Sequence, residues 1–437
     1  MYISYYRQYS KNTLYYSYMK QSIAILITNF EGGGAQKIAI TQAQMFQDLG
    51  YTVHIIALEH QDSYIMPDNF SIHFLSDIKG QSSKFKKLLQ FPLLPFKLAQ
   101  YLKQNQIHLC ISHLERADFV NILAKPFSHH LSIGVIHSHL TSNYTQEGVF
   151  FRSTIYLGLV KLLERFHTRI IAVSRGIEAN LIQLGLPKDK IQVILNPFDI
   201  DGIRALAHQD IGEYASLYQN PVCISTGRLS RQKGFWHSIL AFHSLKKTHP
   251  NIRYIILGDG PLREYHLNFA RSLGLKVYTV WDNQDIKDNY DIYFLGFQKN
   301  PFAFIAQAKV LILPSHYEGL PNVLVESLII GTPVIASDSD SGPRELLAPS
   351  SDITVKTSII EQAEYGILIP LDHNTLPEKP YSLSQSEQYL VSAMELILCN
   401  DEIYNSYHQK SSLRIQDFAQ KTITPQWENL LKDLLHE

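Results

Sequence analysis

The chain has 437 residues, more than one compact domain usually contains, so its length predicts two domains of ordinary size. Its composition, 45% hydrophobic and 18% charged with a formal net charge of −1, is that of a soluble globular protein and argues against a nucleic-acid partner. Three widely spaced cysteines argue against a disulfide framework. Because no run approaches about 18 apolar residues, we expect no transmembrane helix.

The charge is divided unevenly between the two halves of the chain. Residues 1–200 contain 19 Lys and Arg against 13 Asp and Glu, a net charge of +6, and the remaining residues contain 20 against 27, a net charge of −7. A basic first half predicts a face that approaches an anionic partner. The first residues lack the apolar core of a signal peptide, and we expect residues 1–20 to form a disordered extension.

The first regular element predicted is a strand at 22–28, a continuous apolar run typical of a strand buried on both faces. The glycine-rich turn 32–34 comes next, then a helical pattern closed by Gly50, and then a second strand at 53–58. This order predicts the opening βαβ unit of a doubly wound sheet. Further strands are expected at 107–112, 132–136, 169–173 and 191–195.

The same pattern restarts in the second half of the chain. A strand at 222–226 leads into the loop Gly227–Gly234, and a helix follows. Later strands are expected at 253–257, 292–295, 310–313 and 332–336. We therefore predict an α/β fold of two Rossmann-like doubly wound domains, over 21–200 and 201–420. Residues 421–437 have an amphipathic helical pattern, and we expect this helix to pack back on the first domain.

The segment that begins at His316 carries the strongest functional signal. A loop follows the strand there, and then a helix whose end is marked by Gly331. Glu318 and Glu326 are eight residues apart and would not share a helix face, so we place Glu318 in the loop and Glu326 about one turn inside the helix. Pro321 suits the start of the helix. Free helix amides between two carboxylates suit a nucleotide-sugar, which carries a diphosphate between polyhydroxylated rings.

Residues 313–346, LPSHYEGLPNVLVESLIIGTPVIASDSDSGPREL, resemble the Glu-x7-Glu signature of the retaining GT-B glycosyltransferases of the "glycosyl transferases group 1" family. The resemblance is good over 227–346 and looser over 22–370. It implies a GT-B fold, in which the first domain binds the acceptor and the second binds the donor across a cleft. It also implies retaining, metal-independent transfer of a hexose or N-acetylhexosamine without a cofactor. The nucleotide-sugar donor would be UDP-linked, and the acceptor a lipid-linked saccharide or surface glycan, as in bacterial polysaccharide or lipooligosaccharide biosynthesis.

The resemblance also implies roles for single residues. Glu326 corresponds to the glutamate that hydrogen-bonds the nucleotide ribose, and Glu318 to the catalytic glutamate that meets the donor sugar. Arg228 and Lys233 match the family's "GRL…KG" motif and would stabilise charge on the leaving diphosphate. Phe297 lies in the segment beside the base. The other donor-binding positions would offer backbone amides or close approach to the donor: Gly33, Gly34, Gly319, Leu320, Pro321, Asn322 and Val323.

Three histidines compete for the place beside the anomeric centre of the donor sugar. His113 follows a predicted strand where related enzymes place a polar group, and we take it as the catalytic histidine. His137 and His139 follow the next strand and are rivals, and Glu115 would orient or replace His113.

Asp338-Ser339-Asp340 looks like the metal-holding DxD of GT-A enzymes, but it follows the strand at 332–336, and we interpret it as a loop. No metal is expected, because Arg, Lys and helix amides would take its place.

Other readings of the chain remain open. The glycine turn, Arg228 and Lys233 also suit a plain tight turn and surface cations. The chain as a whole also suits a catalytically silent GT-B scaffold that binds a glycan or protein partner, a nucleotide-sugar epimerase, or a nicotinamide dehydrogenase. A dehydrogenase would place an acid such as Glu59 after the second strand but would need GxGxxG, which is absent here.

Residues 84–103 interleave basic and apolar side chains, which is typical of a surface helix or of a segment that meets anionic lipid headgroups. The second reading predicts a cytoplasmic protein held peripherally at the inner face of the cytoplasmic membrane. Two departures from the family pattern stand out. The connection 275–293 is longer than usual, and Asn196-Pro197-Phe198 replaces the common Asn-Gly, which predicts a stiffer hinge.

Overall fold

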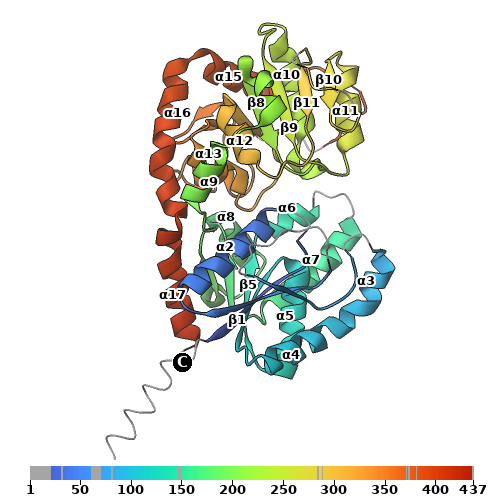
Figure 1. The fold of residues 1–437 in the computed structure, drawn as a ribbon, viewed down its shortest axis with the longest axis vertical. Helices are drawn as coiled ribbons and strands as arrows, with labels where there is room; N and C mark the ends of the chain where they lie inside the picture. The colour runs from blue at the N-terminus through green and yellow to red at the C-terminus, as the bar shows by residue number, and fades with distance from the viewer. Residues whose placement is uncertain are drawn as a thin grey trace, which may run out of the picture.

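The computed structural model describes residues 21–435 except 31–32, 61–69, 80–81, 146–149, 283–284, 288, 371, 373–374 and 380. Two α/β domains follow one another along the long axis of the molecule, the first below the second in Figure 1. The predicted extension at 1–20 lies outside the described residues. Within the described part of the chain, no helix is both long enough and apolar enough to cross a bilayer.

The first domain is built on a parallel sheet whose strands are buried on both faces. Alternate residues of its first strand pack in two cores: Ile25 lies in the same cluster as Phe46 of one covering helix, whereas Leu26 packs with Leu98 and Val120 of helices on the other face. Seven described strands pair in the order β3-β2-β1-β4-β5-β6-β7. They are β1 (Ser22–Ile27), β2 (Thr52–Ala57), β3 (Ile72–Phe74), β4 (Leu109–His113), β5 (Leu131–Ile136), β6 (Arg169–Ala172) and β7 (Ile191–Val193).

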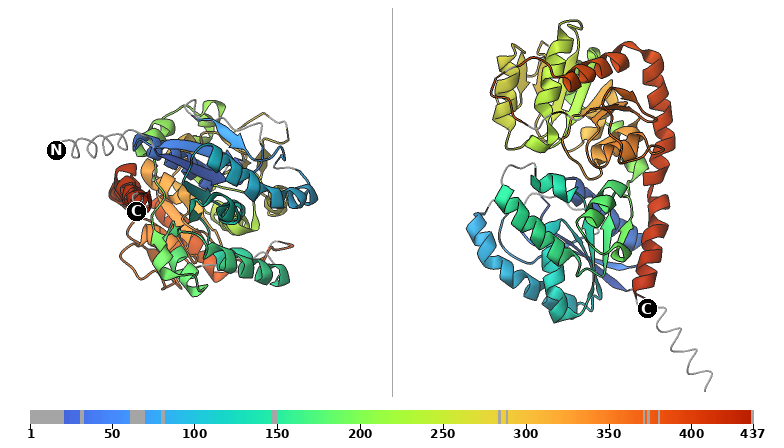
Figure 2. Two further views of the ribbon diagram at one scale, coloured as in Figure 1. Left: turned by 90° about the horizontal axis from the view of Figure 1, so that it is seen from below. Right: turned by 180° about the vertical axis from the view of Figure 1, so that it is seen from behind.

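Helices connect these strands and cover the sheet (Figures 1 and 2). They are α2 (Gly34–Asp48), α3 (Lys84–Gln90), η1 (Phe91–Leu93), α4 (Leu94–Gln104), α5 (Glu115–Ser128), α6 (Leu140–Thr145), α7 (Phe150–Glu164), α8 (Arg175–Gln183) and η2 (Lys188–Lys190). The next elements, α9 (Ile200–Ala207) and η3 (Gly212–Gln219), already contact the second domain: Arg204 Nε donates to the carbonyl of Ile329, and Tyr218 donates to that of Phe304.

The second domain repeats the plan with a mostly parallel sheet. Its described strands pair in the order β10-β11-β9-β8-β12-β13-β15-β14, and only β14 runs antiparallel to its neighbour. The strands are β8 (Val222–Thr226), β9 (Arg253–Leu257), β10 (Val277–Thr279), β11 (Ile292–Phe294), β12 (Val310–Leu313), β13 (Val334–Ser337), β14 (Glu361–Gln362) and β15 (Ile367–Ile369). The helices are η4 (Arg231–Lys233), α10 (Phe235–Lys246), α11 (Arg263–Ser272), α12 (Pro301–Gln307), α13 (Asn322–Ile330), α14 (Pro343–Leu347) and α15 (Gln385–Cys399).

The chain then returns to the first domain. Helices α16 (Asp401–Arg414), η5 (Ile415–Phe418) and α17 (Gln420–Leu435) run down one side of the molecule past both domains (Figures 1 and 2). In α17, buried Trp427 lies edge-to-face on Phe46 of α2, with ring centroids 5.4 Å apart. Where the chain crosses back, the amide of Phe198 donates to the carbonyl of Phe418 at 2.9 Å.

The predicted α/β class and the two doubly wound sheets are confirmed, and the differences lie in element ends and short strands. The strand predicted at 107–112 begins two residues later and ends one residue later, at His113, so the predicted position of His113 at the strand end is confirmed. Helix α17 begins at Gln420 and carries Pro425 inside it. Sequence patterning missed β3, β10, β14 and β15, because two or three residues are too few to show a period.

Candidate functional site

Two carboxylates frame the N-terminus of α13, as the sequence predicted. Glu318 lies in the loop after β12 and Glu326 in the second turn of the helix, and both are buried. Pro321 is the residue just before the first helical one, and the helix ends at Gly331 in the left-handed conformation. The predicted loop-and-helix placement of the two glutamates is therefore confirmed.

Lys233 is paired with Glu318. Its Nζ lies 2.6 Å from Glu318 Oε1, and both side chains are largely removed from solvent. Arg228 differs from it: the residue is exposed and forms no side-chain hydrogen bond or ion pair with any residue that the structure describes. Of the two cations predicted to bind phosphate, Lys233 is therefore neutralised by a carboxylate, whereas Arg228 has no such partner among the described residues.

The first turns of α2 and α13 meet across the domain junction. A Cβ placed on Gly34 would lie 2.8 Å from Nδ2 of Asn322, so only glycine allows this approach without a shift. Asn322 Oδ1 also accepts a hydrogen bond of 2.9 Å from Asn196 at the chain crossing. From the second turn of α2, Lys37 Nζ reaches to 3.4 Å from Glu326 Oε1.

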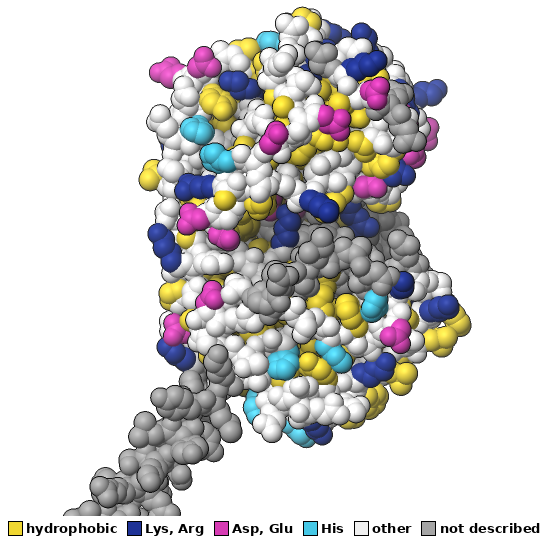
Figure 3. Space-filling model, in the orientation of Figure 1, with side chains coloured by type: hydrophobic (Ala, Val, Ile, Leu, Met, Phe, Trp, Pro, Cys, Tyr) yellow, Lys and Arg dark blue, Asp and Glu magenta, His cyan; other side chains and the backbone are white. Residues whose placement is uncertain are grey.

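Neither helix N-terminus carries a side-chain cap. The residues before the first helical positions are Gly33 and Pro321, and neither residue makes a side-chain hydrogen bond to the free amides of its helix. Free N–H groups give each helix a partial positive charge at this end. Lys and Arg side chains gather along the same junction between the domains, as Figure 3 shows in dark blue. The junction therefore combines two helix N-termini with cations and suits a diphosphate.

Gly319 is pinned between the domains. It forms an isolated antiparallel bridge with Ser138 of the first domain, and a Cβ on it would clash with the carbonyl oxygen of His137. On the other side, Ser341 Oγ donates to the Gly319 carbonyl at 2.8 Å. The loop that carries Glu318 therefore lies directly against the first domain, and this close approach leaves no room for a residue larger than glycine at position 319.

His113 and His137 are joined by a hydrogen bond. His113 Nδ1 lies 2.9 Å from His137 Nε2, and His113 has no exposed surface. Burial lowers the pKa of His113 well below its ordinary value and that of His137 to about 4, so both rings are neutral near pH 7. The rival His139 instead pairs with Ser142 at 2.8 Å.

This pairing joins two of the three histidines that the sequence left in competition. Nε2 of His113 has no hydrogen-bond partner among the described residues. The role of His113 in catalysis stays a prediction.

Asp338 and Asp340 are both engaged with protein groups. Asp338 is buried and accepts a 2.6 Å hydrogen bond from Arg344 Nη2, and it also accepts the Thr357 amide at 2.8 Å. Asp340 accepts a hydrogen bond of 2.5 Å from Ser142 of the first domain. The DxD thus fastens a loop and the domain junction instead of presenting two free carboxylates.

Phe297 is the most exposed large hydrophobic residue of the site region, at 71%. It follows Gly296, whose carbonyl accepts the Gly258 amide at 2.7 Å, and the Asp259 carbonyl accepts the amide of Leu229. These contacts bring the three loops that follow β8, β9 and β11 to one edge of the sheet.

The long connection predicted after residue 275 contains β10 and Trp281, whose ring lies under Arg263.

Several contacts were not foreseen from the sequence. Lys37 was missed, although it is the cation nearest to the glycine turn, one helical turn away. The sequence predicted no role for Glu345, yet its carboxylate accepts hydrogen bonds from the backbone amides of Arg175 and Gly176 at the N-terminus of α8. Glu59 lies buried among Arg116, Lys87 and Asn29 of its own domain, which gives it a structural role.

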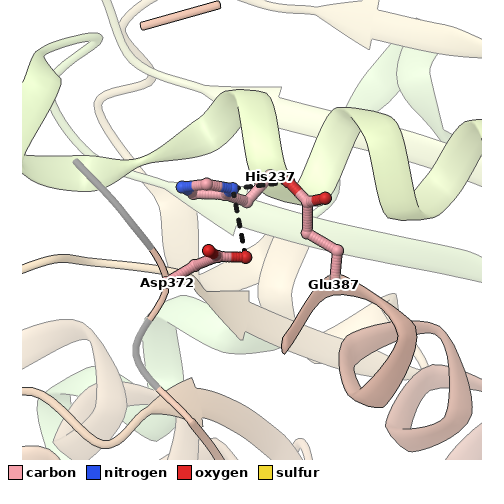
Figure 4. Close-up of side chains that lie close together, drawn as sticks. All are labelled: His237, Asp372 and Glu387. Atoms are coloured by element: carbon pink, nitrogen blue, oxygen red, sulfur yellow. Dashed lines mark hydrogen bonds and ion pairs between the residues drawn. The ribbon is translucent and has the colours of Figure 1, made fainter. Parts of the chain in front are cut away.

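His237 of α10, Asp372 and Glu387 of α15 form a group of side chains of the kinds that can ligate a metal (Figure 4). His237 Nδ1 is 2.6 Å from Glu387 Oε1 and 4.0 Å from Asp372 Oδ2. Glu387 also accepts the amide of Ser384 at 2.8 Å in the capping box of α15, and Ser384 Oγ donates to Asp372. Hydrogen bonds account for this arrangement, which ties the loop before α15 to α10.

Comparison with known proteins agrees with this geometry. Residues 210–378 match the family model described as "Glycosyl transferases group 1", and residues 32–201 match "Glycosyltransferase Family 4". The chain therefore joins a glycosyltransferase family 4 domain to a group 1 glycosyltransferase domain. The two matches fall on the two sheet domains, so the GT-B architecture expected for a group 1 glycosyltransferase is confirmed.

Among its relatives, the chain is 31% identical over 252 residues to an uncharacterized glycosyltransferase of Methanocaldococcus jannaschii, covering 56% of the chain and 58% of that protein. It is 25% identical over 399 residues to the N-acetylgalactosamine-N,N'-diacetylbacillosaminyl-diphospho-undecaprenol 4-alpha-N-acetylgalactosaminyltransferase of Campylobacter jejuni, covering 91% of the chain and 96% of that protein.

Solved structures share the fold. Sucrose-phosphate synthase from Thermosynechococcus elongatus matches with a TM-score of 0.73 at 17% identity, over 95% of this chain and all of that one. Anabaena HepE in complex with UDP and glucose matches with a TM-score of 0.67 at 20% identity, again over 95% of this chain and all of that one.

Proposed function

We propose that this glycosyltransferase moves a hexose or N-acetylhexosamine from a UDP-sugar to a lipid-linked saccharide or surface glycan, with retention and without a metal. The observation that carries the proposal is the meeting of two uncapped helix N-termini at the domain junction, beside Arg228, Lys233 and the buried Glu318 and Glu326. Two relatives named for transfer to lipid-linked saccharides, and neighbours bound to UDP, support the substrate classes.

Each part of the donor finds a group suited to it. Glu326 offers a buried carboxylate to the ribose hydroxyls, and Glu318 offers one to the sugar hydroxyls. Arg228, Lys233 and the amides of residues 319–323 surround the place for the diphosphate. Because Lys233 is paired with Glu318, the donor has to separate this pair before both residues can act on it.

Charge builds on the diphosphate when its bond to the sugar breaks, and fixed cations and amides stabilise that charge most in the transition state. The acceptor oxygen then bonds to the anomeric carbon on the face that the diphosphate leaves, and its proton passes to the leaving phosphate oxygen. This same-face course is the one that the family resemblance implies. Asp338 is held by Arg344, so in this proposal cations and amides of the chain take the place of a metal.

The same proposal places the protein peripherally at the inner face of the cytoplasmic membrane. Along α3, η1 and α4 five large apolar side chains are more than half exposed: Phe85, Leu88, Leu89, Leu93 and Phe96. Figure 3 shows hydrophobic and basic side chains together at this edge of the first domain. Two lysines of this segment turn inward, Lys87 to Glu59 and Lys97 to the carbonyl of Leu75. In this proposal the exposed apolar side chains therefore make the larger contribution to membrane contact.

The test is release of UDP from single UDP-sugars with and without lipid-linked saccharide acceptors. A transferase releases UDP only when donor and acceptor are both present. Conversion of the donor sugar without release of UDP would point to an epimerase, and binding without turnover to a silent scaffold.

Replacement of Glu326 by Ala tests the ribose assignment, since two charge-assisted hydrogen bonds place roughly 2–4 kcal/mol of donor binding at stake. Unchanged UDP affinity in this variant would remove the assignment.

A further inference from the structure

Lys37 belongs to the first domain, yet among the residues that the structure describes its ammonium group contacts Glu326 and Phe302 of the second. Nζ lies 3.4 Å from Glu326 Oε1 and 5.0 Å from the centre of the Phe302 ring in α12. The Lys37 side chain is 50% exposed, whereas the Glu326 side chain is only 9% exposed. One side of the ammonium therefore faces the second domain and the other remains open to a ligand.

The backbone holds Lys37 at this place. Its amide donates to the carbonyl of Gly33, and the next residue, Gly34, packs against Asn322 at the start of α13. Glu326 stands one turn further along the same helix. The ammonium group consequently reaches Glu326 only while the first turns of α2 and α13 are in contact, that is, while the two domains are closed.

The ion pair between Lys37 and Glu326 alone would stabilise the closed arrangement of the domains only weakly. A half-exposed ion pair at 3.4 Å contributes little, because water screens it and a long side chain must be ordered. Lysine has three N–H donors and no acceptor, and a carboxylate that accepts two hydroxyl protons leaves lone pairs on both hydroxyl oxygens. A vicinal diol between Lys37 and Glu326 would satisfy both partners better than they satisfy each other.

We propose that Lys37 is a donor-binding residue contributed by the first domain, with its ammonium group donating to a ribose hydroxyl oxygen whose proton goes to Glu326. The nucleoside is then held by both domains, and donor binding favours the closed arrangement. The inference rests on the proposed function in taking Glu326 as the ribose acceptor.

The experiment compares the affinity for UDP and for 2′,3′-dideoxy-UDP by calorimetry, in the full chain and in Lys37→Met. Methionine keeps the length of the side chain and removes its donors and charge. We expect UDP affinity to fall about 3- to 10-fold in the variant, as for the net loss of one typical hydrogen bond at a half-exposed side chain. Affinity for dideoxy-UDP should stay the same, because the hydroxyls that Lys37 reads are absent. Lys37→Arg should recover part of the loss.

Other results overturn the proposal. An equal loss for both nucleotides would mean that Lys37 acts only through its charge on the diphosphate, and unchanged or tighter UDP binding would mean that it is a counter-ion displaced by the ribose. Glu326→Ala, measured in parallel, separates the two levels: if that variant also binds UDP normally, the ribose assignment itself fails. Lys432→Met is the matched control, since Lys432 pairs with Glu428 on the distant α17.

Discussion

Lys233 Nζ lies 2.6 Å from Glu318 Oε1, so the cation proposed for the diphosphate and the carboxylate proposed for the donor sugar neutralise one another. Both side chains are largely buried, and an isolated buried charge would be costly. If the proposed roles hold, the donor has to replace each partner with a group of its own.

Glu318→Ala should lower kcat by at least about 100-fold, because a contact to the reacting sugar acts most in the transition state. UDP affinity should be unchanged or slightly higher, since Lys233 then has no carboxylate to leave. Steady-state kinetics with saturating acceptor and a direct UDP titration measure both quantities. A raised KM for the donor with an unchanged kcat would assign Glu318 to ground-state binding.

Gly319→Ala should lower turnover about 10-fold or more, because the new methyl group meets the His137 carbonyl and pushes the Glu318 loop away from the first domain. Gly158→Ala in α7 is the control, as a Cβ there has open space. Transfer rates and thermal melting of both variants separate a displaced loop from an unfolded one. Full activity of Gly319→Ala would mean that the loop works without this contact.

Glu164→Gln should flatten the pH dependence of stability. Burial, and next the charge of Glu115, raise the pKa of Glu164 to about 8, so the folded protein keeps a proton that the unfolded chain releases near its ordinary pKa of about 4.5. The contribution of Glu164 to the free energy of unfolding is complete below about pH 4.5. It falls by about 1.4 kcal/mol per pH unit as the pH rises to about 8.

The measurement for Glu164→Gln is chemical unfolding at steps from pH 5 to 8. The variant should lose less stability over that range than the parent protein. Glu178→Gln, at a partly exposed position in α8, should keep the parental slope. Parallel slopes for Glu164→Gln and the parent would show that Glu164 is ionised throughout.

Leu88→Glu should weaken co-sedimentation with anionic vesicles, because Leu88 is 70% exposed on α3 and a carboxylate is both polar and repelled there. High salt should also weaken binding of the parent protein by screening its basic residues. Leu413→Glu replaces an equally exposed leucine, at 68%, on α16 and should bind as the parent does. Equal binding of both variants would locate membrane contact elsewhere or exclude it.

Chelation with EDTA should leave transfer nearly intact if Arg228, Lys233 and helix amides bind the diphosphate as proposed, because Asp338 is already held by Arg344. The rate before and after dialysis against EDTA is the measurement. Loss of activity that manganese restores would show that Asp338 and Asp340 hold a metal after all.

Local sequence signals identified the parts of the site that depend on local structure. Hydrophobicity predicted the strand at 310–313, and Pro321 and Gly331 predicted where the following helix begins and ends. Glu318 and Glu326 were therefore placed correctly in the loop and in the helix. Contacts between distant segments were not readable. Lys37 and Glu326 are 289 positions apart. His113 ends β4 and His137 follows β5, and no single segment encodes the relative register of these two neighbouring strands. These contacts arise only once both sheets and their packing exist.

The return of the C-terminal helix has a consequence for dissecting the protein. Trp427 completes the surface of the first domain by covering Phe46, and Phe198 and Phe418 hydrogen-bond where the two connections run side by side. A fragment that stops near residue 200 would expose the face that Trp427 covers. An exchange of domains between relatives would therefore need three segments, with the last helix travelling together with the first domain.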